Sequence, residues 1–392
     1  MTEVTLQDLR RELHQIPEIG LDLPKTRDRL LRELEPLAIE LTTSSRIGSV
    51  VGVIRGRSTG RAVLLRADMD ALPIREPEGL DFRSLHEGAM HACGHDLHMA
   101  GLVGAARLLS ANRDELAGDV VLMFQPGEER CGGARIMIEE GVLDAAGPRV
   151  GAAFAVHVGP GPRGLVTTRP GPILAGSNEL RVTIRGRGGH GSTPHTARNP
   201  VSIAAAVATA IESFTAERFD PFDPVVATVT MLHGGELVNV IPDEARLAAT
   251  VRTFSESSIE IIHQQLVPLI EGMATARGAT AHVEFIVDYP VTVNAPDLTE
   301  WVGEVVGHRF GNARLHRAEH PLMGSEDFSF VAARVPSTMM FLGATPDGLD
   351  PRRAASVHSP NVVFDDAVLD DQATLLTTLA EQWLAQASGV AP

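Results

Sequence analysis

The sequence of 392 residues contains only two cysteines, Cys93 and Cys131, and this scarcity excludes a domain held together by disulfide bonds. It has no apolar run close to the roughly 20 residues that span a bilayer, and its charged N-terminus lacks the apolar core of a secretory signal. Only one of the 34 basic residues is a lysine, Lys25, and 50 acidic residues give a formal net charge of −16. No basic stripe is available for nucleic acid or for an anionic membrane. These absences predict a reduced, cytoplasmic, globular protein.

What the sequence does contain is a regular alternation of apolar runs and helical patterns in its first part. Apolar runs at 48–54, 61–68, 119–125 and 150–158 are separated by helical patterns, for example at 98–112. Continuous apolar strands between helices are typical of a parallel sheet that is covered on both faces. The fold class predicted is therefore α/β, with a mainly parallel sheet and helices on both of its faces.

The middle of the chain has a different pattern. Polar and apolar residues alternate at 179–186, and the order of elements reads strand, helix, strand, strand, helix, strand. This order is typical of a ferredoxin-like α+β module with an antiparallel sheet. We therefore expect an inserted domain at 175–288 within a discontinuous domain formed by 1–174 and 289–392.

The densest cluster of metal-binding residue types is the segment MHACGHDLH at 90–98. Thiolate, imidazole and carboxylate groups are the ligands that hold zinc and related divalent ions. The segment also allows a second interpretation, a polar loop before a helix in which His91 and His98 act as caps. The candidates in it are Met90, His91, Cys93, His95, Asp96 and His98.

Polar residues also follow three predicted strands. Asp68 and Asp70 lie at the end of the strand at 61–68, Glu128 and Glu129 follow the strand at 119–125, and His157 ends the strand at 150–158. In open α/β sheets the active site lies outside the carboxyl ends of the strands. A metalloenzyme needs one carboxylate as a ligand and another as a base, although two adjacent glutamates are also common as a solvated surface pair.

Eight motifs carry a family resemblance that covers residues 10–385. In order along the chain they are LLRADMDALP, MHACGHDLH, FQPGEE, AVHV, GRGGHGSTPHTARNP, NVIPDEARLAATVR, MGSEDFSF and VHSPNVVF. Together they resemble the dinuclear metal amidohydrolases of the aminoacylase and carboxypeptidase superfamily. The most similar branch contains hippurate hydrolases, auxin-conjugate hydrolases and N-acetyldiaminopimelate deacetylases.

The resemblance assigns roles to the polar residues at the carboxyl ends of the predicted strands. Glu128 matches the general base that activates a metal-bound water. Two divalent ions are implied, and a mixed set of sulfur, nitrogen and oxygen ligands suits Zn, Mn, Co or Ni. The residues that match metal ligands are Cys93, His95, Glu129, His157 and His358.

Three aspartates lie beside these ligands in the motifs. In the related peptidase branch the strand-end motif is His-x-Asp, whereas this chain has Asp68 in the first position. This departure weakens a dipeptidase or aminopeptidase interpretation, and the role of Asp68 stays open. We expect Asp70 to orient a ligand by a hydrogen bond. Asp96 is expected either to support a ligand in the same way or to cap the next helix.

The inserted domain carries the remaining candidates. The resemblance makes His190 an oxyanion-stabilising group, which in many relatives the partner subunit of a dimer contributes. Asn239 and Arg252 match positions that hold the carboxylate of the substrate, a task for which a planar guanidinium is suited, although Arg252 also reads as a salt bridge on a strand face. Gly324 and Ser325 are expected to contact the substrate from a glycine loop.

The expected activity is the hydrolysis of N-acyl amino acids to a carboxylic acid and a free amino acid. The inserted domain would close over this small-molecule substrate as a lid and form a homodimer or a larger homo-oligomer, with no nucleic acid or membrane as partner. Two alternatives remain: a metallo-exopeptidase that acts as a dipeptidase or carboxypeptidase, and a non-catalytic metal-dependent binding protein.

Overall fold

The computed structural model describes residues 4–58 and 60–386, and the chain divides into two compact units. The first unit comprises the chain up to Ile173, the segment Val293–Pro321 and the chain from Asp327 onward. The second unit comprises Leu174–Thr292 and Leu322–Glu326, so Gly324 and Ser325 belong to the second unit.

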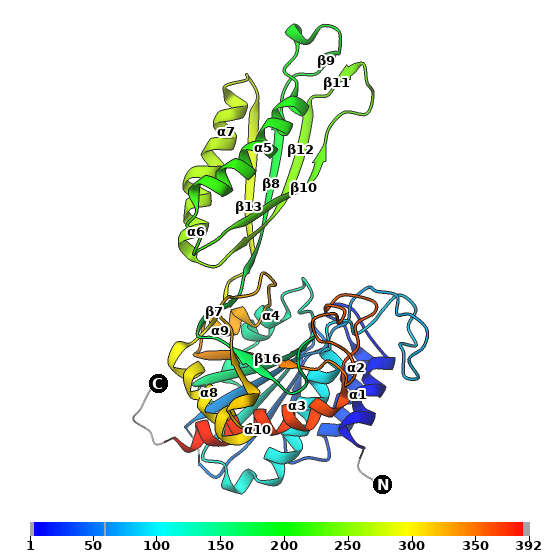
Figure 1. Ribbon diagram of the computed structural model, residues 1–392, viewed down its shortest axis with the longest axis vertical. Coiled ribbons are helices and arrows are strands. Elements are labelled where there is room, and N and C mark those ends of the chain that lie inside the picture. The colour runs from blue at the N-terminus through cyan, green and yellow to red at the C-terminus, as the bar shows by residue number, and fades with distance from the viewer. Residues whose placement is uncertain (1–3, 59, 387–392) are drawn as a thin grey trace. The chain divides into compact units, whose positions relative to one another are not determined.

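An eight-stranded sheet forms the centre of the first unit (Figure 1). Neighbouring strands β3 and β4, β3 and β5, and β5 and β16 run parallel, while β1 and β2 form an antiparallel edge. This arrangement confirms the predicted fold class. In spatial order the strands are β1 (Glu40–Thr43), β2 (Val50–Ile54), β4 (Asp119–Gln125), β3 (Ala62–Asp68), β5 (Ala152–Gly159), β16 (Ser337–Gly343), β6 (Val166–Thr168) and β15 (Leu315–Arg317).

Two groups of helices pack on this sheet. Helix α3 packs against α1, α10 and β3, and α8 packs against α10 and β16. Helix α4 contacts α9 and strand β4, and α9 contacts β16. Since α3 and α8 contact these two strands as well, the two groups of helices cover the two faces of the sheet. The helices of the first unit are α1 (Leu6–Gln15), α2 (Pro24–Leu34), α3 (His95–Ala111), α4 (Gly133–Glu139), α8 (Pro296–Phe310), α9 (Ser329–Ala332) and α10 (Leu369–Ala385).

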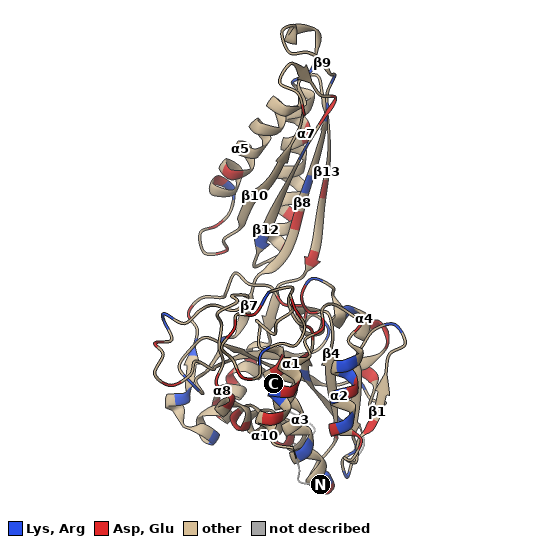
Figure 2. Cartoon of the chain, turned by 90° about the vertical axis from the view of Figure 1, so that its right-hand side faces the viewer, with Lys and Arg blue, Asp and Glu red and all other residues tan. Residues whose placement is uncertain are grey.

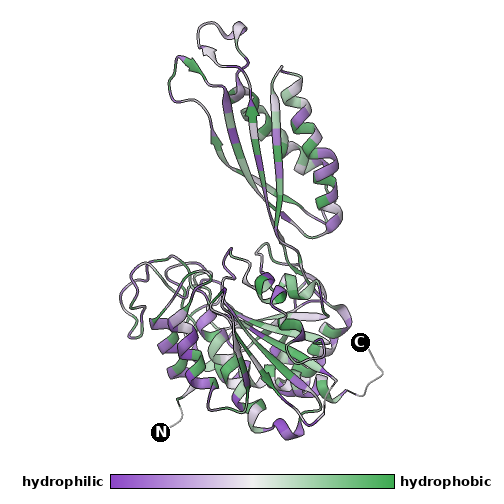
Figure 3. Ribbon diagram, turned by 180° about the vertical axis from the view of Figure 1, so that it is seen from behind, coloured by the Kyte–Doolittle hydropathy of each residue, from purple (hydrophilic) through white to green (hydrophobic). Residues whose placement is uncertain are grey.

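Burial explains why these segments form strands and helices. Every residue of β3 and β4 is buried, as expected for parallel strands between two helical layers. Figure 3 shows hydrophobic residues along the central strands, and Figure 2 shows acidic and basic residues side by side on α2. Among the described residues, the structure contains no helix with the length and apolar character of a membrane span.

Helix α3 begins earlier than the sequence pattern predicts, at His95 rather than at residue 98. The preceding residue, Gly94, has φ +81°, and a Cβ there would lie 2.4 Å from Val158 Cγ2. Only glycine fits this left-handed, crowded position without strain. Because residues three apart share a face of a helix, His95 and His98 lie together, with ring centroids 5.4 Å apart.

Asp96 is directed to a different partner, helix α1. Its carboxylate accepts hydrogen bonds from Arg10 Nε at 2.7 Å and His14 Nδ1 at 2.8 Å, and all three residues are buried. Burial opposes the charge on Asp96, but Arg10 and His14 outweigh it and hold the pKa of the carboxyl far below its usual range. His14 is therefore part of the contact between α1 and α3.

The second unit is a four-stranded antiparallel sheet with helices on one face. Its strand order is β10-β12-β8-β13. Along β12, buried residues alternate with residues that are partly or fully exposed. Asn199 caps α5, with its side chain accepting a hydrogen bond from the backbone N–H of Val201. The elements are β8 (Gly176–Arg185), β9 (Gly189–His190), α5 (Pro200–Arg218), β10 (Val226–His233), β11 (Val240–Ile241), β12 (Glu244–Thr253), α6 (Glu256–Ile261), the π-helical turn η4 (Ile262–Leu266), α7 (Val267–Thr275) and β13 (Thr280–Tyr289).

The contact between α1 and α3 predicts a large stability effect for Asp96→Asn. The substitution removes the charge of one of the two carboxylates that pair with the buried Arg10 and of a carboxylate bound by His14, and breaking one side of a buried pair costs about 3–5 kcal/mol. We expect the free energy of unfolding in urea, followed by circular dichroism, to fall by this amount. Asp28→Asn on the exposed side of α2 is the matched control and should change it by less than about 0.5 kcal/mol. Equal effects of both substitutions would contradict the structural role of Asp96.

Candidate metal centre

The five predicted metal ligands meet at the carboxyl edge of the parallel strands in the first unit. Their ligand atoms form overlapping groups in which all members lie within 4.8 Å of one another. One group is Cys93, Glu129 and His358; a second is Asp68, His95, His98 and His157; a third is His95, Glu128 and Glu129. Because Glu129 belongs to the first and third groups, and His95 to the second and third, the groups form one continuous site.

His358 reaches this site from a loop after β16 in an unusual backbone conformation. It has φ +66°, one of two non-glycine residues with positive φ in the described chain. Its Nε2 lies 3.0 Å from Glu129 Oε1, and its backbone N–H donates to the carbonyl of Ala92 at 3.0 Å. The Glu129 carboxylate, which accepts from the His358 ring, raises the pKa of His358, and burial only partly offsets this effect. A backbone held in a sparsely populated region is typical of functional sites.

His95, which is buried, and His157, which is half-buried, present one nitrogen each to the site. His95 Nδ1 lies 2.7 Å from the carbonyl oxygen of Asp70, and His157 Nδ1 lies 2.7 Å from that of Val158. Since a carbonyl only accepts, each Nδ1 carries the hydrogen and each Nε2 has a free lone pair. His157 Nε2 lies 3.5 Å from Cys93 Sγ. Burial lowers the pKa of both rings, which favours the neutral form that binds metal.

Asp70 fixes the two adjacent glutamates. Its carboxylate accepts the backbone N–H of Glu128 at 2.9 Å and that of Glu129 at 3.0 Å, in the tight turn that follows β4. Burial raises the pKa of Asp70 to about 8, more than these two hydrogen bonds lower it, and the nearby charges of Asp68 and Glu129 add to the increase. The same residue therefore holds Glu128, Glu129 and, through its carbonyl, His95.

The residues fit a bound divalent cation on two observations. His95 Nε2 is fully buried and has no hydrogen-bond partner, although an orphaned polar atom is costly in a protein interior. The buried carboxylates of Asp68 and Asp70 and the half-buried carboxylate of Glu129 lie near it, and a cation would compensate their mutual repulsion. Sulfur, imidazole and carboxylate donors form the set that Zn²⁺ and related ions bind.

Sequence reasoning missed a buried polar network beneath the ligands. Arg66 donates to Asp68 Oδ2 at 2.5 Å and to Asp327 Oδ1 at 3.1 Å. The other carboxylate oxygen of Asp68 accepts from His98 Nδ1 at 2.5 Å, and His98 Nε2 accepts the N–H of Val158. Burial opposes ionisation of Asp68, but Arg66 outweighs it and holds the pKa well below the usual value. A lone arginine within the apolar run VLLRA was the available signal for this network.

The second unit holds His190 and Asn239 close together. Strand β9 pairs with β11 so that His190 lies opposite Val240, and the N–H of Gly191 donates to the carbonyl of Asn239 at 2.8 Å. Both residues are exposed, and His190 Nδ1 accepts the N–H of Ser192 at 3.1 Å.

Arg252 lies on the four-stranded antiparallel sheet of the second unit, at the end away from β9 and β11. On β12 it pairs with Ser177 and hydrogen-bonds the hydroxyl of that residue, whereas Glu244, next to the β9–β11 end, pairs with Arg185. The eight residue steps from Glu244 to Arg252 span roughly 27 Å at about 3.4 Å per step. Within one subunit, therefore, the structure does not bring Arg252 together with His190.

Three curated proteins are similar to this chain over most of its length. The "Thermostable carboxypeptidase 1" of Saccharolobus solfataricus is 37% identical over 86% of this chain and 84% of its own. The "IAA-amino acid hydrolase ILR1-like 4" of Arabidopsis thaliana is 36% identical over 96% and 85%. The "N-acetylcysteine deacetylase" of Bacillus subtilis is 32% identical over 97% and 95%.

A solved structure from Bacillus subtilis has the same overall architecture. It is described as a dinuclear metal binding peptidase from the M20 family and superimposes with a TM-score of 0.83 at 29% identity, covering 97% of this chain and 98% of its own. Residues 64–382 match the family model described as peptidase family M20/M25/M40. This match spans more than half of the sequence and includes all five candidate ligands. The chain belongs to the peptidase family M20/M25/M40.

Proposed function

We propose that this protein hydrolyses the amide bond of N-acyl amino acids, releasing a carboxylic acid and a free amino acid. The observation that carries the proposal is the convergence of Cys93, His95, Glu129, His157 and His358 beside the carboxylate of Glu128. The relatives named as a hydrolase of an IAA-amino acid and as a deacetylase of N-acetylcysteine support this substrate class.

We assign the following roles in amide hydrolysis to the residues of the site. When bound, divalent ions lower the pKa of a water toward about 7 and polarise the amide carbonyl. The Glu128 carboxylate takes one proton from the attacking water and gives it to the leaving nitrogen as the C–N bond breaks. His190 stabilises the negative charge that develops on the carbonyl oxygen. Arg252 holds the α-carboxylate together with Asn239, which lies beside His190 and therefore comes from the same subunit as His190, and Gly324 and Ser325 contact the substrate.

The cofactors proposed are two divalent ions per subunit, drawn from Zn, Mn, Co and Ni. The solved relative described as dinuclear supports the number, and the mixed donor set supports these metals. We also propose that the protein works in the reducing cytoplasm, because Cys93 must stay reduced to bind metal and neither cysteine forms a disulfide bond.

We further propose a homodimer in which His190 of the partner subunit completes each active site. The separation of His190 and Arg252 along the sheet of the second unit supports this, because a small substrate cannot span it. Strand β10 is an edge strand of that sheet, and its exposed apolar residues Met231 and Leu232 offer a surface for a second copy.

The base is tested by Glu128→Gln. We expect kcat on N-acetyl and N-benzoyl amino acids to fall about 10²–10⁴-fold, because the amide cannot accept a proton, while the metal content measured by mass spectrometry stays at the wild-type level. Glu129→Gln should lose metal and activity together. Loss of metal from the Glu128 variant would make Glu128 a ligand instead of a base.

The carboxylate clamp is tested by Arg252→Ala. Removing a charge-assisted hydrogen bond should raise KM roughly tenfold or more for substrates with a free α-carboxylate, and much less for the corresponding amides. Arg246→Ala, which removes an exposed arginine paired with Glu244 on the same strand, is the control. An equal rise in KM on both substrates would reject the clamp.

The partner contribution is tested by mixing His190→Ala with Glu128→Ala. Each variant alone should be nearly inactive. If each site takes His190 from the partner, random exchange in a symmetric dimer restores one site in four, about a quarter of the wild-type activity. A mixture that stays inactive despite proven subunit exchange would place His190 in its own subunit's site.

A carboxypeptidase is the second candidate, supported by the name of the Saccharolobus solfataricus relative. Dipeptides included in the same substrate panel separate the two: hydrolysis of dipeptides in preference to N-acyl amino acids would favour it.

A further inference from the structure

His98 is a buried residue of α3 to which the proposed mechanism gives no role, although it lies among the candidate ligands. Its side chain is 1% exposed, and its ring nitrogens group with ligand atoms of Asp68, His95 and His157. Both nitrogens are engaged: Nε2 accepts the N–H of Val158 at 2.8 Å, and Nδ1 lies 2.5 Å from Asp68 Oδ1. Since Nε2 is the acceptor, Nδ1 carries the hydrogen, and neither nitrogen keeps a lone pair for a metal.

The backbone of Val158 connects His98 to a predicted ligand. Its N–H donates to His98, and its carbonyl oxygen accepts the hydrogen on His157 Nδ1 at 2.7 Å. This second bond leaves His157 Nε2, which lies 3.5 Å from Cys93 Sγ, free to bind a metal. The rings of His98 and His157 also pack against each other, with centroids 4.5 Å apart and planes inclined by 64°. The conformation of Val158 therefore sets the direction and the tautomer of the His157 ring.

Helix α3 holds the end of β5 at a point where one neighbouring strand has stopped. The ladder between β3 and β5 ends at the pair of Arg66 with Ala155, while β16 still pairs with Val158 on the other side. Past this point the N–H of Val158 donates to His98 instead of to a strand. A Cβ at Gly94 would lie 2.4 Å from Val158 Cγ2, so the turn before α3 packs against the same residue. Val158 is thus fixed by a hydrogen bond and by a side-chain contact from one helix.

His98 is itself held by a buried charged pair. Asp68 accepts from His98 Nδ1 with one oxygen and from Arg66 with the other, both at 2.5 Å. A hydrogen bond to a charged group is roughly twice as strong as a neutral one, so Asp68 fixes the His98 ring more firmly than a carbonyl would. The resulting chain of hydrogen bonds runs, in order, through Arg66, Asp68, His98, Val158 and His157.

We propose that His98, held by Asp68, is a positioning residue that orients His157 for metal binding through the backbone of Val158. The proposal rests on the proposed function for the role of His157 as a ligand. It also gives a role to Asp68, whose two oxygens accept hydrogen bonds from His98 and Arg66. Removing an outer partner of this kind typically costs about 10–100-fold in metal affinity.

The positioning role is tested with His98→Phe, which keeps a flat ring and removes both hydrogen bonds. We expect the affinity for one of two Zn²⁺ ions, measured by competition with a chelator, to fall about 10–100-fold. It should be the ion that His157→Ala loses, not the one that His358→Ala loses, because these two histidines belong to different groups of ligand atoms. His98→Gln, whose amide can donate to Asp68 and accept from Val158, should restore most of the affinity. Undiminished affinity for both ions in His98→Phe would overturn the proposal.

The control for lost stability is Asn294→Leu in the first unit. Asn294 is buried and also holds a strand through both ends of its side chain, accepting the N–H of Met339 at 2.7 Å and donating to the Met339 carbonyl at 2.9 Å. The substitution should lower the free energy of unfolding of the metal-free protein, as His98→Phe does, but leave both Zn²⁺ affinities unchanged. An equal loss of affinity in this variant would mean that instability, not positioning, weakens the metal centre, and would reject the proposal.

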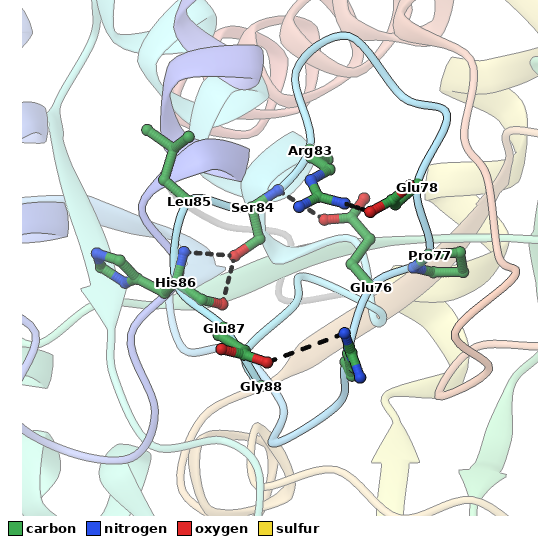
Figure 4. A pocket seen from close by; sticks show the side chains of 10 residues that line it. Glu76, Pro77, Glu78, Arg83, Ser84, Leu85, His86, Glu87 and Gly88 are labelled. Atoms are coloured by element: carbon green, nitrogen blue, oxygen red, sulfur yellow. Dashed lines mark hydrogen bonds and ion pairs between the residues drawn. The ribbon is translucent and has the colours of Figure 1, made fainter.

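The control for the histidine itself is His86→Phe. His86 lies on the loop around the surface depression drawn in Figure 4. Both of its ring nitrogens are hydrogen-bonded, as those of His98 are: Nδ1 to the Pro17 carbonyl and Nε2 to Lys25 Nζ, each at 2.8 Å. Among the described residues, His86 belongs to no group of possible ligand atoms. Its substitution should therefore leave the Zn²⁺ affinities unchanged.

A measurement on the metal-free protein separates this proposal from the proposed function. In wild type labelled with nitrogen-15 histidine, the NMR shifts of His157 should show the hydrogen fixed on Nδ1, and in His98→Phe they should show a mixture of the two tautomers. A tautomer that stays fixed in the variant would overturn the positioning role, even in a protein that hydrolyses N-acyl amino acids. A mixture in the variant would support the role even if wild type bound no Zn²⁺, a result that would reject the proposed function instead.

Discussion

The two hydrogen bonds from the backbone of Glu128 and Glu129 to Asp70 join the segments on which the metal centre depends. Asp70 follows β3, the glutamates follow β4, and the Asp70 carbonyl binds His95 at the start of α3. Asp70 thus positions the ligand Glu129 and the proposed base Glu128, and it fixes the tautomer of the second ligand, His95. Because neighbouring parallel strands end at the same edge, the sheet delivers these segments to one place, and Asp70 fixes their relative orientation.

This arrangement places several carboxylates in the interior, and arginines on different sides of the site pair with most of them. Arg66 pairs with Asp68 and Asp327 below the ligands, and Arg10 pairs with Asp96 on the far side of the first turn of α3. Asp70 is left without such a cation, and its pKa rises as a consequence. Asp70 Oδ1 lies 3.8 Å from Nδ1 of His95, and the unpartnered Nε2 of the same ring lies 3.6 Å from Asp68 Oδ2. A divalent ion is the group that satisfies both the carboxylates and the imidazole, which makes the site dependent on its metal.

The sequence predicts the buried part of the fold better than the exposed part. The apolar run at 119–125 coincides with β4, because full burial leaves a continuous hydrophobic signal. The edge strand β1 was missed, because ELTT is largely exposed and carries no such signal. The helix pattern at 132–143 predicts too long a helix, since Gly141 at φ +90° follows α4 and separates it from the 3₁₀ turn at Val142–Asp144. Motif resemblance identified the candidate ligands, but the partners of His98 and Arg66 depend on contacts between distant segments, which no local pattern encodes.

The first turn of α3 serves both the metal centre and the packing of the helix. His95 presents its unpartnered Nε2 to the proposed metals, whereas the next residue, Asp96, accepts hydrogen bonds from Arg10 and His14 of α1. Because breaking one side of a buried charge pair costs about 3–5 kcal/mol, this contact holds the start of α3 in place and with it the ring of His95. The charges that pack the helix and the group that would bind metal thus depend on the same turn.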